Sequence, residues 1–386
     1  MVEGSFLRLR TVHSHRGPNS GDRVKSFPAS NAAYEKWLAQ RLGGERVRGD
    51  LLYKREKIAT DPFTFLRGTY WRWSEIIPTL CPELTDAPSL LAIGDVHLEN
   101  YGIWRDADER LVWGLNDFDE AAVMPYALDV VRLAVSALLA DRTGGLSARE
   151  ICNVLLAGYR GALSDPRPIV LERDFEELRT WILSREESRK KFWGNLEALP
   201  KKPAPPRYVE VIKSTLPDPD MPFRTARRRA GVGSLGRPRW VAMGEWCGGP
   251  VVREAKALLP SAWNLSHAPQ DRSIRTAELM AGPHRAPDPS LKVADNIVVR
   301  RLAPHARKLE LGARVRSSLS TEILRLMAFE IGNLHAADPK IAHTIETDLA
   351  RRPEGWLRSA VKRAAAQTRR DWEDWSLHLQ ARRRPR

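Results

Sequence analysis

The feature that most constrains the fold is a change of hydrophobic period that divides the chain into helical and strand-forming parts. Residues 61–77 and 127–140 carry apolar side chains in helical spacing, and Pro78 is expected to end the first of these helices. Between the two helices, short apolar runs alternate with polar loops, at residues 89–93, 101–104 and 111–115. Because runs of this length are typical of strands, we expect a small sheet enclosed by helices.

A proline-rich segment at residues 197–207 separates this part of the chain from one of different composition. Strand-like runs and closing helical patterns follow it, at residues 240–243, 250–253, 296–302, 320–337 and 354–379. The order of helices, short strands, linker, strand-rich section and closing helices predicts an α+β protein with a smaller β-rich lobe.

The predicted domain boundaries follow these changes of pattern. Residues 1–30 are expected to be a flexible basic segment, and residues 31–196 a helix-rich unit with two polar loops. The linker at 197–207 leads to a β-rich unit at 208–303, and helices with a basic tail return at 304–386.

Charge and composition exclude some classes of protein and leave others open. The 62 Lys and Arg residues exceed the 48 Asp and Glu residues and give a formal net charge of +14, which is compatible with nucleic acid or phosphorylated ligands. No zinc-finger, homeodomain or RNA-recognition pattern accompanies this charge, so a solvated basic surface is favoured and nucleic-acid binding stays open. No apolar run is long enough for a membrane span. Three scattered cysteines and an N-terminus without an apolar signal segment predict a cytoplasmic protein.

Two polar loops at the ends of neighbouring predicted strands carry the sharpest chemical signal. The first reads GDVHLEN at residues 94–100 and the second reads NDFDE at residues 116–120. Asp95 could accept the proton of a hydroxyl nucleophile, while Asn100 and Asp117 could hold Mg²⁺ against phosphate oxygens. Asp119 is expected to be a further metal ligand or a turn cap. Acids that only cap turns are the alternative for each residue taken alone.

A glycine-rich segment, GVGSLG at residues 231–236, is the second constellation. A dinucleotide-binding turn would need a helix directly after the third glycine. Residues 237–243 contain Pro, Trp and Val instead, which favours a strand. The segment is therefore predicted to be a flap between two strands, whose backbone N–H groups approach phosphate oxygens. The nucleotide-binding residues proposed in it are Gly231, Gly233, Ser234 and Gly236.

The two acidic loops resemble the G-D-x-H-x-x-N and D-F-[DE] motifs of kinases related to the aminoglycoside phosphotransferases. This resemblance implies that Asp95 is the catalytic base, that Asn100 and Asp117 bind metal, and that Asp129 stabilises the catalytic loop. His97 is the motif histidine and is expected to support the site. The sequence departs from the pattern at Ile93, where that superfamily usually has histidine.

In such kinases, a lysine on a strand after the flap pairs with the phosphates and is held by a glutamate on the next helix. Lys256 and Glu278 are the candidates here. Asp95 precedes Gly231 in the chain, whereas in ordinary kinases the flap comes first, and residues 324–339 resemble the helix that follows the kinase hinge. The resemblance therefore implies a two-lobed, protein-kinase-like fold with circularly permuted motifs.

Residues from about 50 to 340 also resemble a bacterial family known as domain of unknown function 2252. The shared motifs are FTFLRG at residues 63–68, the GDVHLEN and NDFDE loops, and GVGSLG. No substrate is established for that family. Within the first motif, Arg67 is a candidate for binding an anionic group of the substrate, although a salt-bridged surface arginine is the more ordinary interpretation.

The function expected from the sequence is transfer of a phosphoryl group from ATP, with Mg²⁺, to the hydroxyl of an unidentified small molecule. Three alternatives stay open: an inactive nucleotide-binding regulatory protein, adenylyl transfer on the same scaffold, and a basic nucleic-acid-binding protein. The acceptor and the oligomeric state are not readable from the sequence.

Overall fold

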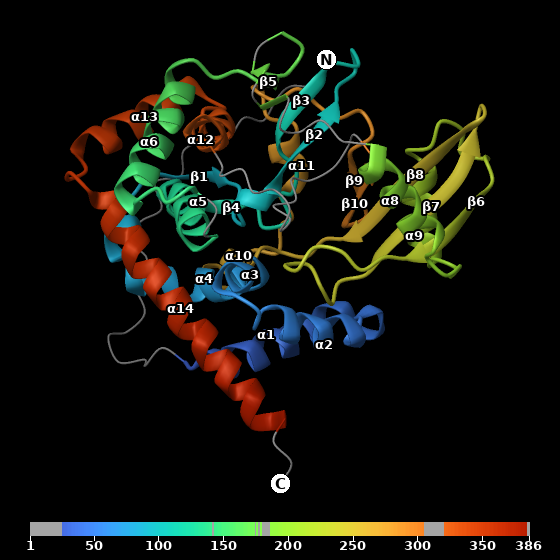
Figure 1. The fold of residues 1–386 in the computed structure, drawn as a ribbon, viewed down its shortest axis with the longest axis horizontal. Helices are drawn as coiled ribbons and strands as arrows, with labels where there is room; N and C mark the ends of the chain where they lie inside the picture. Colours follow the sequence, from blue (N-terminus) through green and yellow to red (C-terminus); the bar gives the residue numbers. More distant parts are fainter. Residues whose placement is uncertain are drawn as a thin grey trace.

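The computed structural model describes residues 25–140, 143–173, 175–176, 178–179, 186–304 and 320–383. Figure 1 shows a helix-rich part and, beside it, a twisted antiparallel sheet. The α+β class expected from the sequence is confirmed, since helices surround small antiparallel sheets. No helix in the described part of the chain has the length and apolarity that a bilayer span requires.

Four helices open the helix-rich part: α1 (Phe27–Leu42), α2 (Arg48–Lys57), α3 (Pro62–Gly68) and α4 (Tyr70–Leu80). Asp61 caps α3 by accepting a hydrogen bond from the Thr64 backbone N–H (2.8 Å). Two predictions were wrong here. The helix expected over 61–77 is broken at Thr69, whose φ of −133° is not helical, and Pro78 lies within α4 instead of ending the helix.

The start of α1 also corrects the expected flexible segment at residues 1–30. Phe27 is fully buried, and its ring packs on those of Phe65 and Trp71 at centroid distances of 4.6 and 5.4 Å. Burial of a phenylalanine among other aromatic rings stabilises the helix end that carries it. Residues 1–24 of that segment lie outside the described residues.

Two small sheets position the acidic loops. They are formed by β1 (Ser89–Ala92) with β4 (Ala122–Pro125), and by β2 (Tyr101–Arg105) with β3 (Leu111–Leu115) and β5 (Ile169–Val170). Tyr101 pairs with Leu115 in the β2–β3 hairpin, so the loop that enters β2 and the loop that leaves β3 meet at one end. A hydrogen bond from the Asn116 backbone N–H to the Asn100 carbonyl (3.2 Å) joins them.

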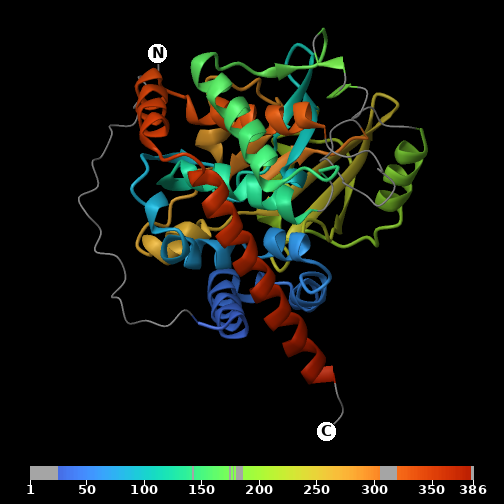
Figure 2. The same ribbon diagram turned by 60° about the vertical axis from the view of Figure 1, so that its left-hand side comes forward.

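Five further helices complete the core: α5 (Ala127–Leu139), α6 (Ala148–Ser164), α12 (Thr321–His335), α13 (Pro339–Arg351) and α14 (Trp356–Arg383). Helices α6 and α12 pack closely because glycines stand at their contact: a Cβ on Gly158 would lie 2.0 Å from the Arg325 carbonyl oxygen. The long helix α14 crosses the helix-rich part in Figure 2. The closing helices thus pack against the helices of the first half, and α13 was not foreseen.

The large sheet has the order β6-β7-β8-β10-β9 and is antiparallel throughout. Its strands are β6 (Phe223–Arg227), β7 (Arg239–Trp246), β8 (Gly249–Ala257), β9 (Lys292–Ala294) and β10 (Ile297–Arg301). Helix α9 (Pro206–Lys213) covers one face, where Tyr208 and Ile212 form a core with Trp240, Ala255 and Val299. Helix α8 (Glu186–Glu197) packs on the opposite face of the sheet, through Leu196 against Val241 and Val252.

The predicted linker and the β8–β10 connection both belong to this fold. Lys201, in the linker, forms a β-bridge with Ala226, so the segment is attached to β6 and is not a free spacer. Helices α10 (Ala262–His267) and α11 (Thr276–Met280) connect β8 to β9. In β8, Glu254 and Lys256 share one face because alternate residues of a strand point to the same side. That face is turned toward the acidic loops, since the Lys256 side chain reaches Asp117.

Candidate active site

Asp95 is the first residue of the candidate site, and it directly follows a position where the backbone requires glycine. Gly94 has a φ of +94°, and a Cβ there would lie 2.3 Å from the Glu120 carbonyl oxygen. Arg132 of α5 is fully buried and donates to Asp95 Oδ1 from Nε (3.0 Å) and from Nη2. A Cβ on Gly233 would lie 3.4 Å from Asp95 Oδ2. One carboxylate oxygen is thus held by arginine while the other faces the glycine-rich loop.

Asn100 ties the two acidic loops together. Its side-chain nitrogen donates to the backbone carbonyls of Asp95 (3.2 Å) and Asp117 (3.1 Å). Because the nitrogen is turned toward these carbonyls, a metal ion would bind Asn100 through its amide oxygen.

Asp117 and Asp119 meet one cation from strand β8 and one from the connection between β6 and β7. Lys256 Nζ lies 3.1 Å from Asp117 Oδ1 and 2.6 Å from Asp119 Oδ1. Arg237 approaches Asp119 at 3.3 Å and pairs with Glu120 at 2.9 Å. Burial, with the neighbouring charge of Asp117, raises the pKa of Asp119 above its usual value even though both cations oppose this.

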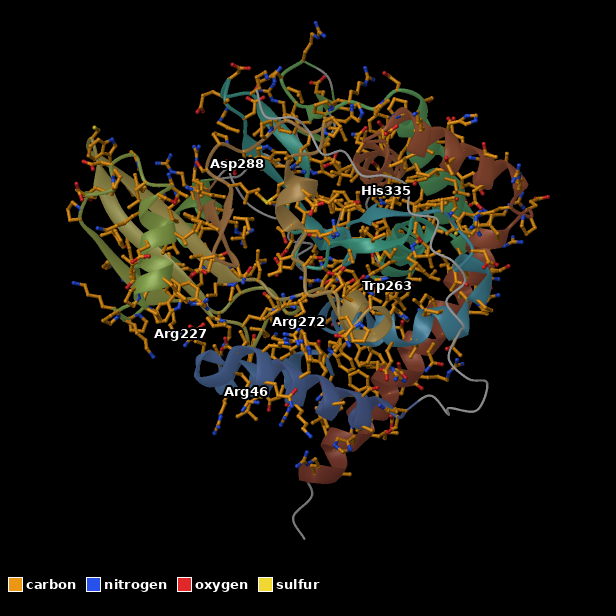
Figure 3. All side chains as sticks on the ribbon, turned by 180° about the vertical axis from the view of Figure 1, so that it is seen from behind. Arg46, Arg227, Trp263, Arg272, Asp288 and His335 are labelled. Atoms are coloured by element: carbon orange, nitrogen blue, oxygen red, sulfur yellow. The ribbon has the colours of Figure 1, made fainter. Side chains whose placement is uncertain are left out.

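Asp129 and His335 form a buried support beneath the Asp95 loop. The Asp129 carboxylate accepts hydrogen bonds from the backbone N–H groups of Ile93 (2.7 Å) and Gly94 (3.0 Å), and it lies 3.1 Å from His335 Nε2. The Tyr159 hydroxyl lies 2.9 Å from the other ring nitrogen of His335, and all these side chains are buried. Figure 3 shows His335 within the helix-rich part, which fits packing and not contact with substrate.

The flap predicted at residues 231–236 connects two antiparallel strands, β6 and β7, and no helix follows its third glycine. Gly236 has a φ of +97°, and a Cβ there would lie 2.5 Å from the Leu51 side chain. Gly231 also has a positive φ, of 70°. Ser234 accepts a hydrogen bond from Arg239 Nη2 (2.7 Å). The backbone of the flap therefore needs glycine where it turns and where it touches α2.

Lys54 of α2 also holds this flap through a hydrogen bond to its backbone. Its Nζ donates to the Gly233 carbonyl at 2.8 Å and lies 5.6 Å from the centre of the Tyr34 ring. Burial lowers the pKa of Lys54 to about 8, with a further contribution from the Arg237 charge.

Three arginines surround Glu254 on the site-facing side of the large sheet. Arg239 and Arg300 lie 2.5 and 2.6 Å from Glu254 Oε1, and Arg228 pairs with Oε2. Burial alone would raise the pKa of Glu254, but the three guanidinium groups hold it well below the usual range. Arg228 belongs to the basic run 227–229, so part of that run is used in an internal ion pair and not in a solvated surface.

The remaining predicted residues lie as follows. Glu278 does not pair with Lys256 in the described structure: its carboxylate pairs with Arg275 of the preceding turn at 3.0 Å, while Lys256 pairs with the two aspartates. Arg67 pairs with Glu99 at 2.5 Å. His97 begins the short turn 98–100, where its Nδ1 accepts from the Glu99 backbone N–H (3.1 Å).

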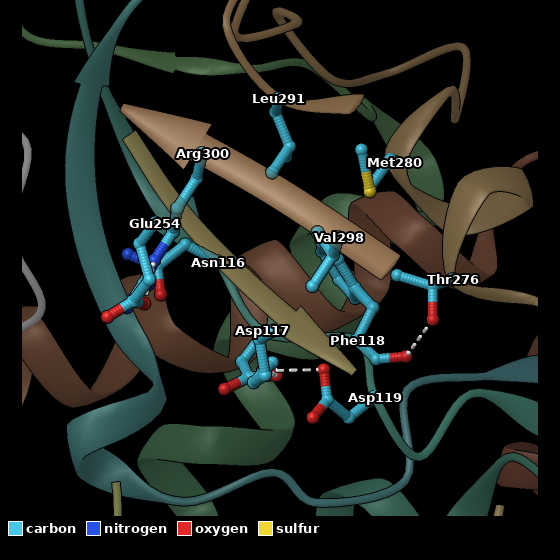
Figure 4. Close-up of a pocket in the computed structure, with 11 residues that line it drawn as sticks. Asn116, Asp117, Phe118, Asp119, Glu254, Thr276, Met280, Leu291, Val298 and Arg300 are labelled. Carbon is cyan, nitrogen blue, oxygen red and sulfur yellow. Dashed lines mark hydrogen bonds and ion pairs between the residues drawn. The ribbon is translucent and has the colours of Figure 1, made fainter. Parts of the chain in front are cut away.

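Two pockets share Asp117 and Asp119 as a common wall. The first, which we call the Asp95 pocket, has about 700 Å³ of empty volume and is lined by Asp95, Asn100, Gly233 and Arg67, among others. The second, which we call the Asn116 pocket, has about 340 Å³ and lies against Lys256 (Figure 4). The candidate catalytic, metal and flap residues, which are far apart in the chain, therefore gather around two adjoining pockets.

The oxygen donors present suit a magnesium ion. Asp117, Asp119 and Asn100 supply carboxylate and amide oxygens, which Mg²⁺ prefers, and it commonly takes only one or two carboxylates with water and phosphate oxygens completing its shell. In the described residues no cluster of three or more His, Cys, Asp or Glu side chains suits a metal ion. An ion here would therefore depend on phosphate oxygens, and Asp117 suits it better than Asp119, whose side chain is only 10% exposed and meets two cations.

Sequence reasoning missed the cations that organise the site. Arg132, Lys54 and Arg237 each bind a carboxylate or carbonyl within it. One signal was present in the sequence: Arg132 interrupts the apolar face of residues 127–140, and a charge in a buried stripe requires a partner.

Comparison with known protein families gives a match over part of the chain. The sequence model of a family described as "Uncharacterized protein conserved in bacteria (DUF2252)" matches residues 46–199. The matched segment contains both acidic loops and Asp129 and ends before the flap, and it supports the family resemblance seen in the motifs. No curated protein and no solved structure matches the chain.

Proposed function

We propose that this protein transfers a phosphoryl group from ATP, with Mg²⁺, to the hydroxyl of a small molecule, in a kinase-like active site with circularly permuted motifs. One observation carries the proposal: the Asp95 loop, the Asp117 loop, the glycine flap and Lys256 surround two adjoining pockets. Phosphoryl transfer depends on positioning and on stabilising charge, which is what this set of groups can supply.

Asp95 is assigned the role of general base. Arg132 holds Oδ1, so Oδ2 is the atom that would receive the proton of the acceptor hydroxyl. Arg132 also donates to the Leu66 carbonyl (2.9 Å), which fixes the guanidinium independently of Asp95. The base is thus oriented before any substrate arrives.

Asn100 and Asp117 would hold the metal ion, which would neutralise charge on the phosphate oxygens when bound. Lys256 now bridges Asp117 and Asp119, and the entry of a triphosphate would offer its ammonium group new anionic partners. The flap would contribute backbone N–H groups, with Gly233 positioned by Lys54.

Thermal unfolding with and without ATP and Mg²⁺ tests the nucleotide site. A ligand at about 100 times its Kd stabilises the folded state by about 2.7 kcal/mol. We expect a Mg²⁺-dependent rise in Tm that is absent in Asp117→Ala. No rise with any nucleotide would contradict the proposal.

Turnover is tested separately with Asp95→Asn, which preserves the shape of the side chain. The variant should bind Mg·ATP like the parent but transfer no phosphate, because the amide cannot accept the proton. Equal loss of binding and transfer would contradict the assigned role. Release of ADP would indicate phosphoryl transfer, whereas pyrophosphate would indicate the adenylyl alternative.

A further inference from the structure

The Asn116 pocket has a different chemistry from the Asp95 pocket. Four apolar side chains line it: Phe118, Met280, Leu291 and Val298. They come from the loop after β3, from α11, from the segment before β9, and from β10. Figure 4 shows these side chains with Asn116 and Arg300 at one side of the pocket and Thr276 at the other. This apolar side of the pocket suits an uncharged ring, while the charged side chains of Glu254, Lys256 and Arg300 line the rest.

The floor of this pocket is fixed by a hydrogen bond. Thr276 Oγ1 donates to the Phe118 carbonyl at 3.0 Å and so holds α11 against the acidic loop. Phe118 is 2% exposed, and Arg285 lies 4.9 Å from the centre of its ring. Phe118 and α11 are therefore held in place without a ligand, which reduces the entropy lost on binding.

The Asn116 side chain places a hydrogen-bond acceptor without a partner in the lining of this pocket. Its Oδ1 is buried and has no hydrogen-bond partner in the described part of the chain, while its backbone N–H is held by the Asn100 carbonyl. A buried polar atom without a partner costs about 1–3 kcal/mol, so a ligand that donates an N–H group here would recover part of this free energy.

The position of the two pockets relative to the charges decides which ligand fits. Asp117 and Asp119 form their shared wall, and Lys256 lies at the edge of the Asn116 pocket. A nucleoside triphosphate with its base beside Asn116 would bring its phosphates past Lys256 toward Asp95.

We propose that the Asn116 pocket binds the base of the phosphoryl donor and that Asn116 Oδ1 accepts a hydrogen bond from the exocyclic amino group of that base, which is adenine in ATP. This inference rests on the proposed function and adds to it the location of the base and the residue that recognises it.

The test compares three ligands by calorimetric titration in Mg²⁺ at one salt concentration: ATP, purine riboside triphosphate, which lacks the amino group, and inorganic tripolyphosphate, which lacks the nucleoside. The parent protein should bind ATP about tenfold more tightly than purine riboside triphosphate, the value of one good hydrogen bond. In Asn116→Ala this ratio should fall to about 1, while tripolyphosphate binds as in the parent. Asn195→Ala, the same change at an exposed position of α8, should retain the parent's values for all three ligands.

A second variant, Met280→Trp, fills the apolar space. It should weaken the binding of ATP at least as strongly as Asn116→Ala does and leave the binding of tripolyphosphate unchanged. Unchanged tripolyphosphate binding would also show that the site is folded. Retention of the ATP preference in Asn116→Ala, or equal affinity of the parent for ATP and tripolyphosphate, would overturn this inference and leave the proposed function standing. Failure of all three ligands to bind the parent would overturn the proposed function itself.

Discussion

Asp129 and the pair Asp117–Asp119 lie on either side of strand β4, yet they are satisfied in opposite ways. Asp129 is fully buried and is held by two backbone N–H groups and by His335. Asp117 and Asp119 have side chains 24% and 10% exposed and are held by the side-chain cation Lys256, with Arg237 also on Asp119. Backbone donors cannot leave without unfolding the loop, whereas a lysine can change partners. The kind of donor around a carboxylate, backbone or side chain, therefore distinguishes a structural acid from one that can exchange partners.

The largest expected effect is on the structural side of this comparison. Asp129→Ala leaves the N–H groups of Ile93 and Gly94 without their acceptor in the core, and should lower the free energy of unfolding by about 3–5 kcal/mol. Urea denaturation measures the change. Asp129→Asn, which keeps one acceptor oxygen, is the matched control and should lose less. A loss below about 1 kcal/mol in the alanine variant would contradict the claim that backbone donors mark a carboxylate with a structural role.

Glu330 of α12 is a further buried acid, and its hydrogen bonds are long and come from both backbone and side-chain donors. It lies 3.3 Å from the Leu115 N–H, 3.2 Å from Arg285 and 3.4 Å from the Asn333 amide. Burial raises its pKa from 4.5 to about 7, although Arg285 opposes this. The folded protein therefore binds this proton more tightly than the unfolded chain does. The resulting stability is fully present below the unfolded pKa and is lost as the pH rises through about 7, a loss of about 3 kcal/mol.

Urea denaturation at about pH 5 and about pH 8 measures this loss in the parent protein, and Glu330→Gln should largely remove the difference. If the parent and the variant showed the same pH dependence, the quality of the donors around a buried acid would not decide its charge.

The smallest expected effect on stability is at the exchangeable site. Lys256→Ala should lower the free energy of unfolding by only about 1–2 kcal/mol, because Asp119 keeps Arg237 and Asp117 is partly exposed to water. The same variant should abolish the Tm rise produced by Mg·ATP. Lys340→Ala, at an exposed position of α13, is the control and should keep that rise. A destabilisation as large as that of Asp129→Ala would place Lys256 among the structural residues.

The local parts of the site were predictable because they depend on short-range patterns. Strand-length apolar runs predicted β1, β2 and β3, and the pairing of Tyr101 with Leu115 brings their loops together. Pro238 and the apolar run after it predicted a strand, and β7 begins at Arg239. Turn residues and hydrophobic period act over a few residues, so they appear in the sequence itself.

Partners across the fold were not predictable. Glu278 was paired with Lys256 on the order of elements alone, but its near neighbour Arg275 takes that carboxylate. Pro78 was expected to end a helix, yet it lies in the last turn of α4, where its effect on the remaining hydrogen bonds is small.

The α+β class, the strand-ending acidic loops and the glycine flap could be predicted from the sequence, because hydrophobic period and backbone freedom are properties of short segments. The packing of distant segments alone places Arg132 on Asp95, Lys54 on the flap and Asn116 in a pocket with four apolar side chains. A lysine, arginine or asparagine has the same local preferences in water as in a core, so its partner is fixed only when distant segments pack and remove the water between them.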